Sequence, residues 1–263
     1  ETGVKVYEGA ARGIKRVTME LGGKSPNIVF ADANIDNAVK GVISGIFAAT
    51  GQTCIAGSRL LVQESIHDEF VENVVDLARK ARMGDPQEFE TQVGPVTNLP
   101  QLETVLDYIR IAKEEGANTA LGGARAERPE CGKGWFVEPT IFTGVRNEMR
   151  IAQEEVFGPV LSVIPFKDDE EAIAIGNDVV YGLAAGVWTQ NIGRAITMAE
   201  KLQAGMVWIN TYRAVSYLSP FGGYKRSGIG RESGQEMIKE YLQLKSVWIE
   251  TSNADAPNPF VLR

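Results

Sequence analysis

The fold is decided by the stretch ELGGKSPNIVFADANIDNAVKGVISGIFAATGQTCIAGSRLLV, residues 20–62. Its apolar run at residues 26–30 predicts a buried strand, and the apolar spacing over residues 35–49 predicts a helix. A second apolar run at residues 59–62 predicts another strand. We therefore expect a strand-helix-strand unit in which Cys54 lies between the helix and the second strand.

The same alternation continues along the rest of the chain. Short strands are predicted at residues 160–166, 183–188 and 206–210. Helices are predicted at residues 99–116, 169–177 and 192–203. A further helix is predicted to begin with Ser65 and Asp68 as a capping box. This pattern predicts an α/β fold with a mainly parallel sheet flanked by helices.

The composition is that of an ordinary globular protein and excludes several classes of function. The chain has 263 residues, of which 44% are hydrophobic, enough for a sizeable core. The net charge of -7 and the lack of a long basic run argue against a nucleic-acid partner. We expect no membrane span and, because cysteines are few, a cytoplasmic protein. The single histidine, His67, predicts no metal site and is expected at a solvated helix position.

Two reactive side chains lie next to glycine-rich turns. Cys54 closes a Gly-Gln-Thr-Cys run, and Glu20 opens a Glu-Leu-Gly-Gly run. A thiol and a carboxylate can together supply a nucleophile and a base for covalent chemistry on a carbonyl. Taken alone, an isolated Cys54 would more often be an inert buried thiol, and Glu20 a surface carboxylate.

Four ordered motifs resemble those of the NAD(P)-dependent aldehyde dehydrogenase superfamily. They are MELGGKSP at residues 19–26, FAATGQTCIAGS at residues 47–58, EEVFGPV at residues 154–160 and PFGGYKRSGIGRE at residues 220–232. The resemblance runs from residue 1 to about residue 250. In that family a nucleotide-binding domain precedes the Glu20 motif, so the resemblance implies that this chain is the catalytic portion of a longer protein.

The resemblance implies roles for the two reactive residues. Cys54 would attack an aldehyde substrate, and its own amide would be one donor of an oxyanion hole. Oxidation of the thiohemiacetal would then give a thioester, and Glu20 would activate the water that hydrolyses it. Relatives that pass the acyl group to coenzyme A typically lack this glutamate, so the expected product is a free carboxylic acid.

The resemblance also implies a site for NAD or NADP, between which the sequence does not choose. Glu155 would hold the nicotinamide ribose hydroxyls, and Phe157 would pack beside the nicotinamide ring. Without the motif, Phe157 could as well be a core ring. Further positions near the cofactor are matched by Leu21, Gly22 and Gln101. Glu232 matches a glutamate linked to proton release, although a plain charge on a first helical turn is an equal alternative.

Three segments follow from the resemblance. Residues 1–21 would be a remnant of the nucleotide-binding domain, residues 22–226 the catalytic domain, and residues 227–263 a return segment and tail. A strand near residues 244–250 would serve in oligomerisation, so a homo-oligomer is expected.

Two other functions stay open. The chain could act as a weak, cofactor-independent thiol esterase through Cys54 and Glu20, which ester turnover insensitive to NAD would reveal. It could instead have a structural or binding role on the same fold, which an unreactive Cys54 would support. The second cysteine, Cys131, lies in a polar loop and is expected to be non-catalytic.

Overall fold

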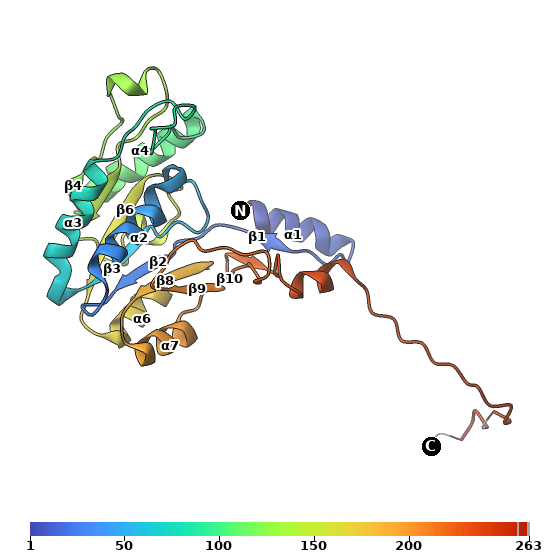
Figure 1. Cartoon of the computed structure of the whole chain (residues 1–263). Coiled ribbons are helices and arrows are strands. Elements are labelled where there is room, and N and C mark those ends of the chain that lie inside the picture. Colours follow the sequence, from blue (N-terminus) through green and yellow to red (C-terminus); the bar gives the residue numbers. More distant parts are fainter. Residues whose placement is uncertain (257, 262–263) are drawn as a thin grey trace.

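The computed structural model describes residues 1–256 and 258–261 and is built on a seven-stranded sheet (Figure 1). The strand order is β4-β5-β6-β3-β2-β8-β9. The strands are β2 (Pro26–Val29), β3 (Arg59–Gln63), β4 (Asn118–Leu121), β5 (Thr140–Thr143), β6 (Val160–Phe166), β8 (Ala184–Trp188) and β9 (Met206–Ile209). All neighbours are parallel except β4, which is antiparallel to β5. The predicted α/β fold with a mainly parallel sheet is confirmed.

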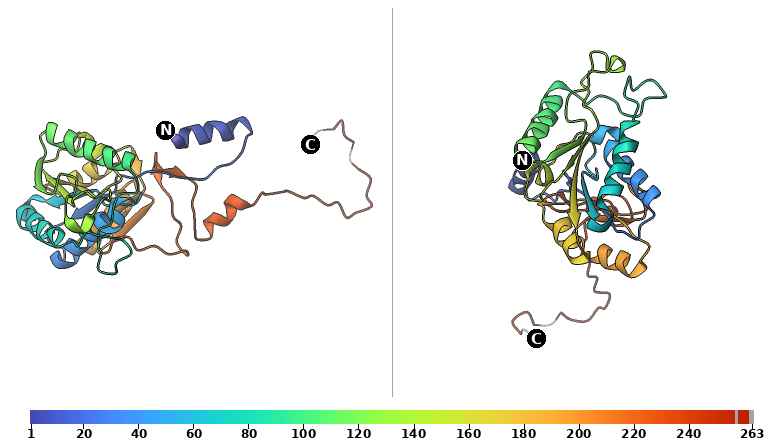
Figure 2. Two further views of the ribbon diagram at one scale, coloured as in Figure 1. Left: turned by 90° about the horizontal axis from the view of Figure 1, so that it is seen from above. Right: turned by 90° about the vertical axis from the view of Figure 1, so that its left-hand side faces the viewer.

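Helices cover both faces of this sheet (Figures 1 and 2). The helices are α2 (Ile35–Phe47), α3 (His67–Arg79), α4 (Leu99–Glu114), α5 (Arg150–Gln153), α6 (Asp169–Asn177) and α7 (Ile192–Lys201). α2 and α3 pack on one face, against Leu60 and Leu161. The other four helices pack on the opposite face, against Leu61 and Val160 among others. Adjacent strand residues therefore serve opposite layers, as the pleat of a strand requires.

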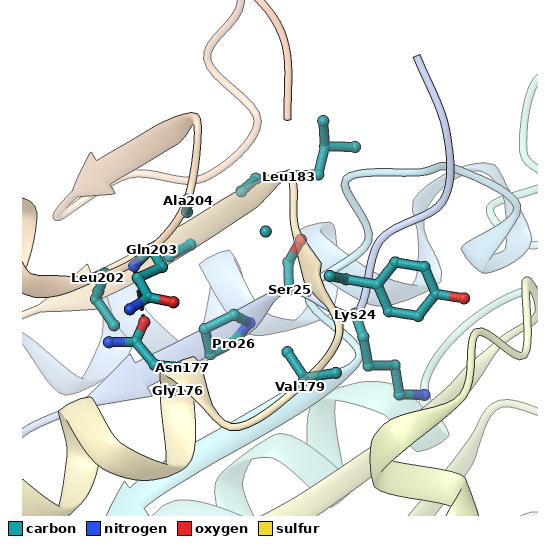
Figure 3. A pocket seen from close by; sticks show the side chains of 14 residues that line it. Lys24, Ser25, Pro26, Gly176, Asn177, Val179, Leu183, Leu202, Gln203 and Ala204 are labelled. Carbon is teal, nitrogen blue, oxygen red and sulfur yellow. Dashed lines mark hydrogen bonds between the residues drawn. The ribbon is translucent and has the colours of Figure 1, made fainter. Parts of the chain in front are cut away.

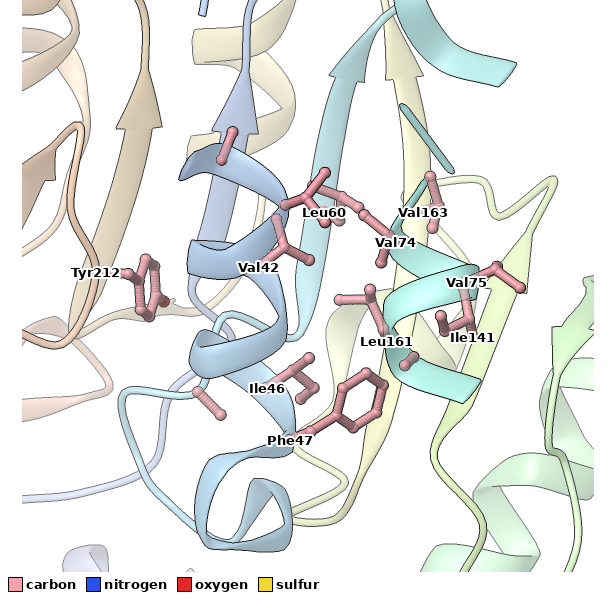
Figure 4. Close-up of a cluster of buried hydrophobic side chains, with 14 of the residues drawn as sticks. Val42, Ile46, Phe47, Leu60, Val74, Val75, Ile141, Leu161, Val163 and Tyr212 are labelled. Carbon is pink, nitrogen blue, oxygen red and sulfur yellow. The ribbon is translucent and has the colours of Figure 1, made fainter. Parts of the chain in front are cut away.

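The layer under α2 and α3 forms the largest apolar cluster of the described residues (Figure 4). Val42 and Ile46 from α2 and Val74 from α3 are fully buried against Leu60 and Leu161 of the sheet. Burying a side chain of this size contributes about 1.5–3 kcal/mol. The cluster fixes α2 on the sheet, and the loop that carries Cys54 begins where α2 ends.

Parallel register aligns the amino ends of three adjacent strands. Pro26 of β2 lies opposite Arg59 of β3, and Arg59 lies opposite Ser162 of β6. The segments that enter these strands carry the Glu20, Cys54 and Glu155 motifs respectively. Strand pairing therefore brings the three motifs together at the amino-terminal ends of these strands, although they are far apart in sequence.

Two small antiparallel sheets lie beside the main one, near helix α1 (Thr2–Arg12) (Figures 1 and 2). β1 (Met19–Glu20) pairs with β11 (Gly228–Ile229), and β7 (Tyr181–Gly182) pairs with β10 (Tyr224–Lys225). The first pairing brings the C-terminal motif directly to Glu20. Among the described residues, no helix has the length and apolar character needed to cross a bilayer.

Several local predictions are wrong. The helix predicted to start with a capping box at Ser65 follows a 3-10 turn over Glu64–Ile66 and has no side-chain cap, because the Asp68 carboxylate contacts the His67 ring instead. His67 is half-buried rather than solvated. β4 and β5 were not predicted, since each has only four residues and so short a run carries little pattern.

The strand predicted at residues 244–250 for oligomerisation is not formed within one copy of the chain and stays a prediction. The segment after the 3-10 turn Glu236–Tyr241 pairs with no strand in the part of the chain that the structure describes, and it projects away from the body (Figure 2). A strand is defined by its hydrogen-bonded neighbour, and an extended segment without one exposes its backbone donors and acceptors to water.

Substitution of Arg59 should lower the stability of the fold more than substitution of any other polar residue. Its guanidinium is fully buried and donates to the carbonyls of Lys24, Ile175 and Gly176 and to Asn147 Oδ1. Arg59→Lys cannot reach all four acceptors, so we expect the free energy of unfolding in urea to fall by about 2–4 kcal/mol.

The matched control is Arg79→Lys, which alters an exposed ion pair with Asp76. Exposed pairs of this kind contribute about 0–1 kcal/mol. Equal losses for the two variants would contradict the structural role assigned to Arg59.

Candidate active site

The loop that carries Cys54 has an unusual backbone. α2 continues into a 3-10 turn, Ala48–Gly51, in which Ala49 and Thr50 have φ values of 51° and 57°. Non-glycine residues rarely adopt this left-handed region, and such strain is concentrated at functional sites. Gly51, at φ 69°, abuts the Gly158 carbonyl so closely that a side chain would overlap it. The Cys54 loop is thereby pressed against the segment that carries Glu155 and Phe157.

Cys54 is half-buried and its charge state depends on its neighbours. Burial raises the pKa of the thiol, and the negative charges of Glu20 and Glu155 raise it further. Hydrogen bonds from the amides of Cys54 and Ile55 act in the opposite direction. The structure therefore brings the thiol and both predicted carboxylates within electrostatic reach of one another. The same two amides are donors for negative charge that develops beside the sulfur.

Glu20 lies at the end of β1 with a partly desolvated carboxyl group. Its pKa is raised to about 7, mainly by burial and then by the charge of Glu232, while Arg231 opposes the shift. Oε2 is enclosed and has no hydrogen-bond partner among the described residues. A carboxyl group with a pKa near neutrality is suited to general-base catalysis, because both protonation states are accessible.

Glu155 joins two motifs by a direct hydrogen bond. Its Oε1 accepts from the Gly23 amide at 2.9 Å, and its carboxylate lies so close to Gly22 that a side chain there would overlap it. Burial raises the pKa of Glu155, whereas the Gly23 amide and the Lys24 charge oppose this shift. The carboxylate is thus held at the entrance to β2, with Oε2 left for another donor.

Gln101 lies behind the cofactor motif and supports it. Its Nε2 donates to the carbonyls of Val156 and Phe157, both at 3.0 Å. Phe157 has a φ of 55° and a ring that is 37% exposed. The two hydrogen bonds hold this strained backbone and leave the aromatic side chain outside the core.

A groove of about 450 Å³ runs between α1 and the body of the protein. It is lined by three of the predicted cofactor residues, Leu21, Gly22 and Glu155. Lys225 and Arg226 add positive charge to its wall. The volume and the mixture of a carboxylate, backbone and cations fit a dinucleotide, whose ribose hydroxyls and phosphates need these partners. Phe157 and Gln101 lie outside this lining.

Lys24 is a residue that the sequence analysis passed over. It is 2% exposed beside a cavity of about 10 Å³, and Figure 3 shows it across that cavity from Leu202 and Gln203. Its Nζ has no hydrogen-bond partner among the described residues. Burial lowers the pKa of Lys24 to about 7, as does Arg59, while Glu155 and Glu154 oppose this.

Ser227 and Tyr212 are two further supports of the site. Ser227 Oγ donates to the Gly22 carbonyl at 2.6 Å and accepts from the Gly182 amide at 2.9 Å. Tyr212 is buried under the Cys54 loop, and its hydroxyl donates to the Ile55 carbonyl at 3.0 Å. Ser227 could have been found from its place within the C-terminal motif, whereas the position of Tyr212 depends on packing that has no local signal.

The remaining predicted residues fall into two groups. Glu232 lies close enough to Glu20 to raise its pKa, so the C-terminal motif belongs to the site. Cys131 is buried, and the charge that affects the pKa of its thiol most is that of Glu138, which raises it. Within the described ranges, no group of three or more His, Cys, Asp or Glu side chains is arranged to hold a metal ion.

A family model described as "Aldehyde dehydrogenase family" matches residues 1–247. The chain belongs to the aldehyde dehydrogenase family. The resemblance seen in the four sequence motifs is therefore confirmed.

Curated members of the aldehyde dehydrogenase family are similar over nearly the whole chain. The betaine aldehyde dehydrogenase of Mesorhizobium japonicum is 49% identical over 256 residues, which cover 97% of the chain and 53% of that relative. An aldehyde dehydrogenase of Emericella nidulans is 48% identical over 253 residues, covering 96% of the chain and 50% of that protein. The chain thus spans about half the length of the curated relatives it matches.

Solved structures of aldehyde dehydrogenases agree with the fold. The betaine aldehyde dehydrogenase of Staphylococcus aureus in complex with NAD+ gives a TM-score of 0.96 at 43% identity, covering 99% of this chain and 52% of that one. The NAD+ complex of the aldehyde dehydrogenase of Bacillus cereus gives a TM-score of 0.92 at 47% identity, covering 95% of this chain and 50% of that one.

The raised pKa of Glu20 predicts a pH-dependent stability. The folded-state pKa of about 7 exceeds the ordinary value of 4.5, so the folded chain holds a proton that the unfolded chain has lost between these values. The associated stabilisation is full below about pH 4.5 and is lost as the pH rises through 7. Glu20→Gln should therefore raise the Tm at pH 8 more than at pH 5.

Calorimetric Tm values of both proteins from pH 5 to 8.5 test this, with Glu72→Gln on the exposed side of α3 as the control. The control should leave the pH dependence of Tm unchanged. Parallel curves for the wild type and Glu20→Gln would show that Glu20 is not desolvated.

Proposed function

We propose that this chain is the catalytic portion of an NAD-dependent aldehyde dehydrogenase that oxidises an aldehyde to a carboxylic acid. The main support for the proposal is that Cys54, Glu20 and Glu155 lie close together at the amino-terminal ends of β2, β3 and β6. The chain that holds them is a member of this family. The coverage of 53% of a relative supports the chain being one part of a longer enzyme. The division into residues 1–21, 22–226 and 227–263 is proposed on the same basis.

In the proposed reaction, Cys54 releases its proton to solvent, and its Sγ then adds to the aldehyde carbon. The Cys54 amide would be one donor to the oxyanion of the thiohemiacetal. Loss of hydride from that carbon leaves a thioester, and water then attacks the thioester carbonyl. Glu20 accepts a proton from this water, and the carboxylic acid leaves as the thiol of Cys54 is restored.

NAD or NADP, when bound, would accept the hydride. We propose that Glu155 holds the nicotinamide ribose and that Leu21 and Gly22 line the same groove. Phe157, with its exposed ring, would pack beside the nicotinamide. Gln101 acts in this proposal by holding the backbone of Val156 and Phe157. NAD is favoured as the cofactor because two solved relatives are NAD+ complexes.

Pre-steady-state kinetics with excess substrate, in the protein that carries this chain, test the function. Betaine aldehyde and an unbranched aliphatic aldehyde are the substrates, each with NAD and with NADP. Cys54→Ala should form no reduced cofactor. Glu20→Gln should form about one equivalent per active site in a burst and then turn over roughly 100-fold more slowly than wild type, because only thioester hydrolysis needs the base.

Cys131→Ser is the matched control, because it removes the other thiol and should leave both phases unchanged. Reduced cofactor from Cys54→Ala at the wild-type rate would disprove the proposed nucleophile. A normal steady state in Glu20→Gln would disprove the proposed base. Ester hydrolysis by Cys54 without any NAD reduction would favour the esterase alternative.

We also propose a homo-oligomer. The described part of the chain exposes large apolar side chains on α1 and on the C-terminal segment, and contiguous patches of this kind mark interaction surfaces. They are Val4, Val6, Tyr7, Met237, Ile238, Leu244, Val247, Trp248 and Ile249.

Sedimentation velocity of the protein that carries this chain should show a dimer or larger species. Val247→Glu together with Trp248→Glu should shift the distribution towards the monomer, because charge would then have to be buried at the interface. Ile192→Glu, at an exposed position of α7 that does not line the α1 groove, is the control. A monomer at high concentration in the wild type would contradict the proposal.

A further inference from the structure

The environment of Glu20 holds two opposite charges from consecutive residues. Gly222 separates the carboxylate from Arg231: a methyl group placed on Gly222 would be 3.0 Å from Glu20 Oε1 and 2.8 Å from Arg231 Cδ. Both side chains therefore lie against the same glycine. Glu20 Oε2 has no hydrogen-bond partner among the described residues, so burial and nearby charges set the ionisation of Glu20.

Arg231 is held in place by the backbone around it. Its Nη1 donates to the carbonyl of Gly230 at 2.7 Å and to that of Gly223 at 3.1 Å. Its guanidinium carbon lies 5.5 Å from the centre of the Tyr224 ring. These contacts fix the position of the charge without neutralising it, because carbonyl and aromatic groups carry no net charge.

Glu232 is also fixed through its backbone, whereas its side chain is exposed. The Glu232 amide donates to the Phe221 carbonyl at 2.7 Å, and the Phe221 amide donates to the Glu232 carbonyl at 2.6 Å. This antiparallel bridge places Arg231 and Glu232 side by side next to Gly222.

We propose that Arg231 is a positioning residue whose charge favours the ionised form of Glu20, and that the charge of Glu232 acts in the opposite direction. This inference rests on the proposed function only where it treats Glu20 as the base for thioester hydrolysis. The charged or titratable groups that face Glu20 are Arg231, Glu232 and Cys54. The pKa of Glu20 is raised by burial and by Glu232 and lowered by Arg231, which agrees with the geometry.

The test is the titration of the Glu20 carboxyl carbon by NMR in protein labelled with 13C-glutamate, assigned by the signal that Glu20→Gln removes. We expect Arg231→Gln to raise the midpoint by about 0.5–1 pH unit and Glu232→Gln to lower it by a similar amount. Arg231→Lys keeps the charge and should stay close to the wild type. Lys239→Gln, which removes an exposed ion pair with Glu236, should leave the midpoint unchanged.

Shifts of opposite sign for the two variants support the inference. Shifts of the same sign, or none, overturn it. If Arg231→Gln does not fold, Glu232→Gln and Arg231→Lys still decide, because an unmoved midpoint in the former or a raised one in the latter overturns the inference.

A kinetic measurement separates this inference from the proposed function. The pH profile of thioester hydrolysis in the protein that carries this chain should move with the NMR midpoint. If the midpoint moves and the hydrolysis profile does not, the effect of Arg231 and Glu232 on the ionisation of Glu20 is supported. The proposed role of Glu20 as the base is then wrong.

Discussion

The site depends on the parallel register of β6, β3 and β2. These three strands are adjacent in the sheet, and Ser162, Arg59 and Pro26 lie side by side across them. The loop before each strand carries one candidate reactive or binding group. All three loops therefore meet at the amino-terminal ends of the strands. Since a one-residue slip would reverse the facing of every side chain in a strand, the buried layers on both faces fix this register.

Hydrogen bonds between these segments then fix their relative positions. Arg59 links β3 to the Lys24 carbonyl, the Gly23 amide binds Glu155, and Ser227 binds the Gly22 carbonyl. Each hydrogen bond joins segments that are distant in the chain and satisfies a group that burial would otherwise leave without a partner. The short Gly22-Gly23 turn is therefore held from three sides, and a side chain at Gly22 would overlap the carboxylate of Glu155.

The sequence predicted the parts of the molecule that depend on local patterns. The apolar runs of β2, β3, β6 and β8 and the helix that leads to Cys54 were predicted because their periodicity reflects burial on the sheet. β4 and β5 were missed because strands of four residues carry little pattern. The capping box failed because the Asp68 carboxylate contacts the His67 ring. The segment at residues 244–250 reads as a strand, yet among the described residues it has no neighbouring strand.

The proposed nucleophile and the proposed base could be singled out from their motifs, but their charge states could not. These depend on contacts between the beginning and the end of the chain: β1 pairs with β11, and this pairing brings Arg231 and Glu232 beside Glu20. Burial and the charge of Glu232 raise the pKa of Glu20, and burial and the charges of Glu20 and Glu155 raise the pKa of Cys54. A further negative charge in this cluster is therefore unfavourable. Loss of the proton from Cys54 is therefore coupled to the protonation of Glu20. Arg231 is the cation that moderates this competition, which makes the C-terminal motif part of the electrostatics of the site as well as of its structure.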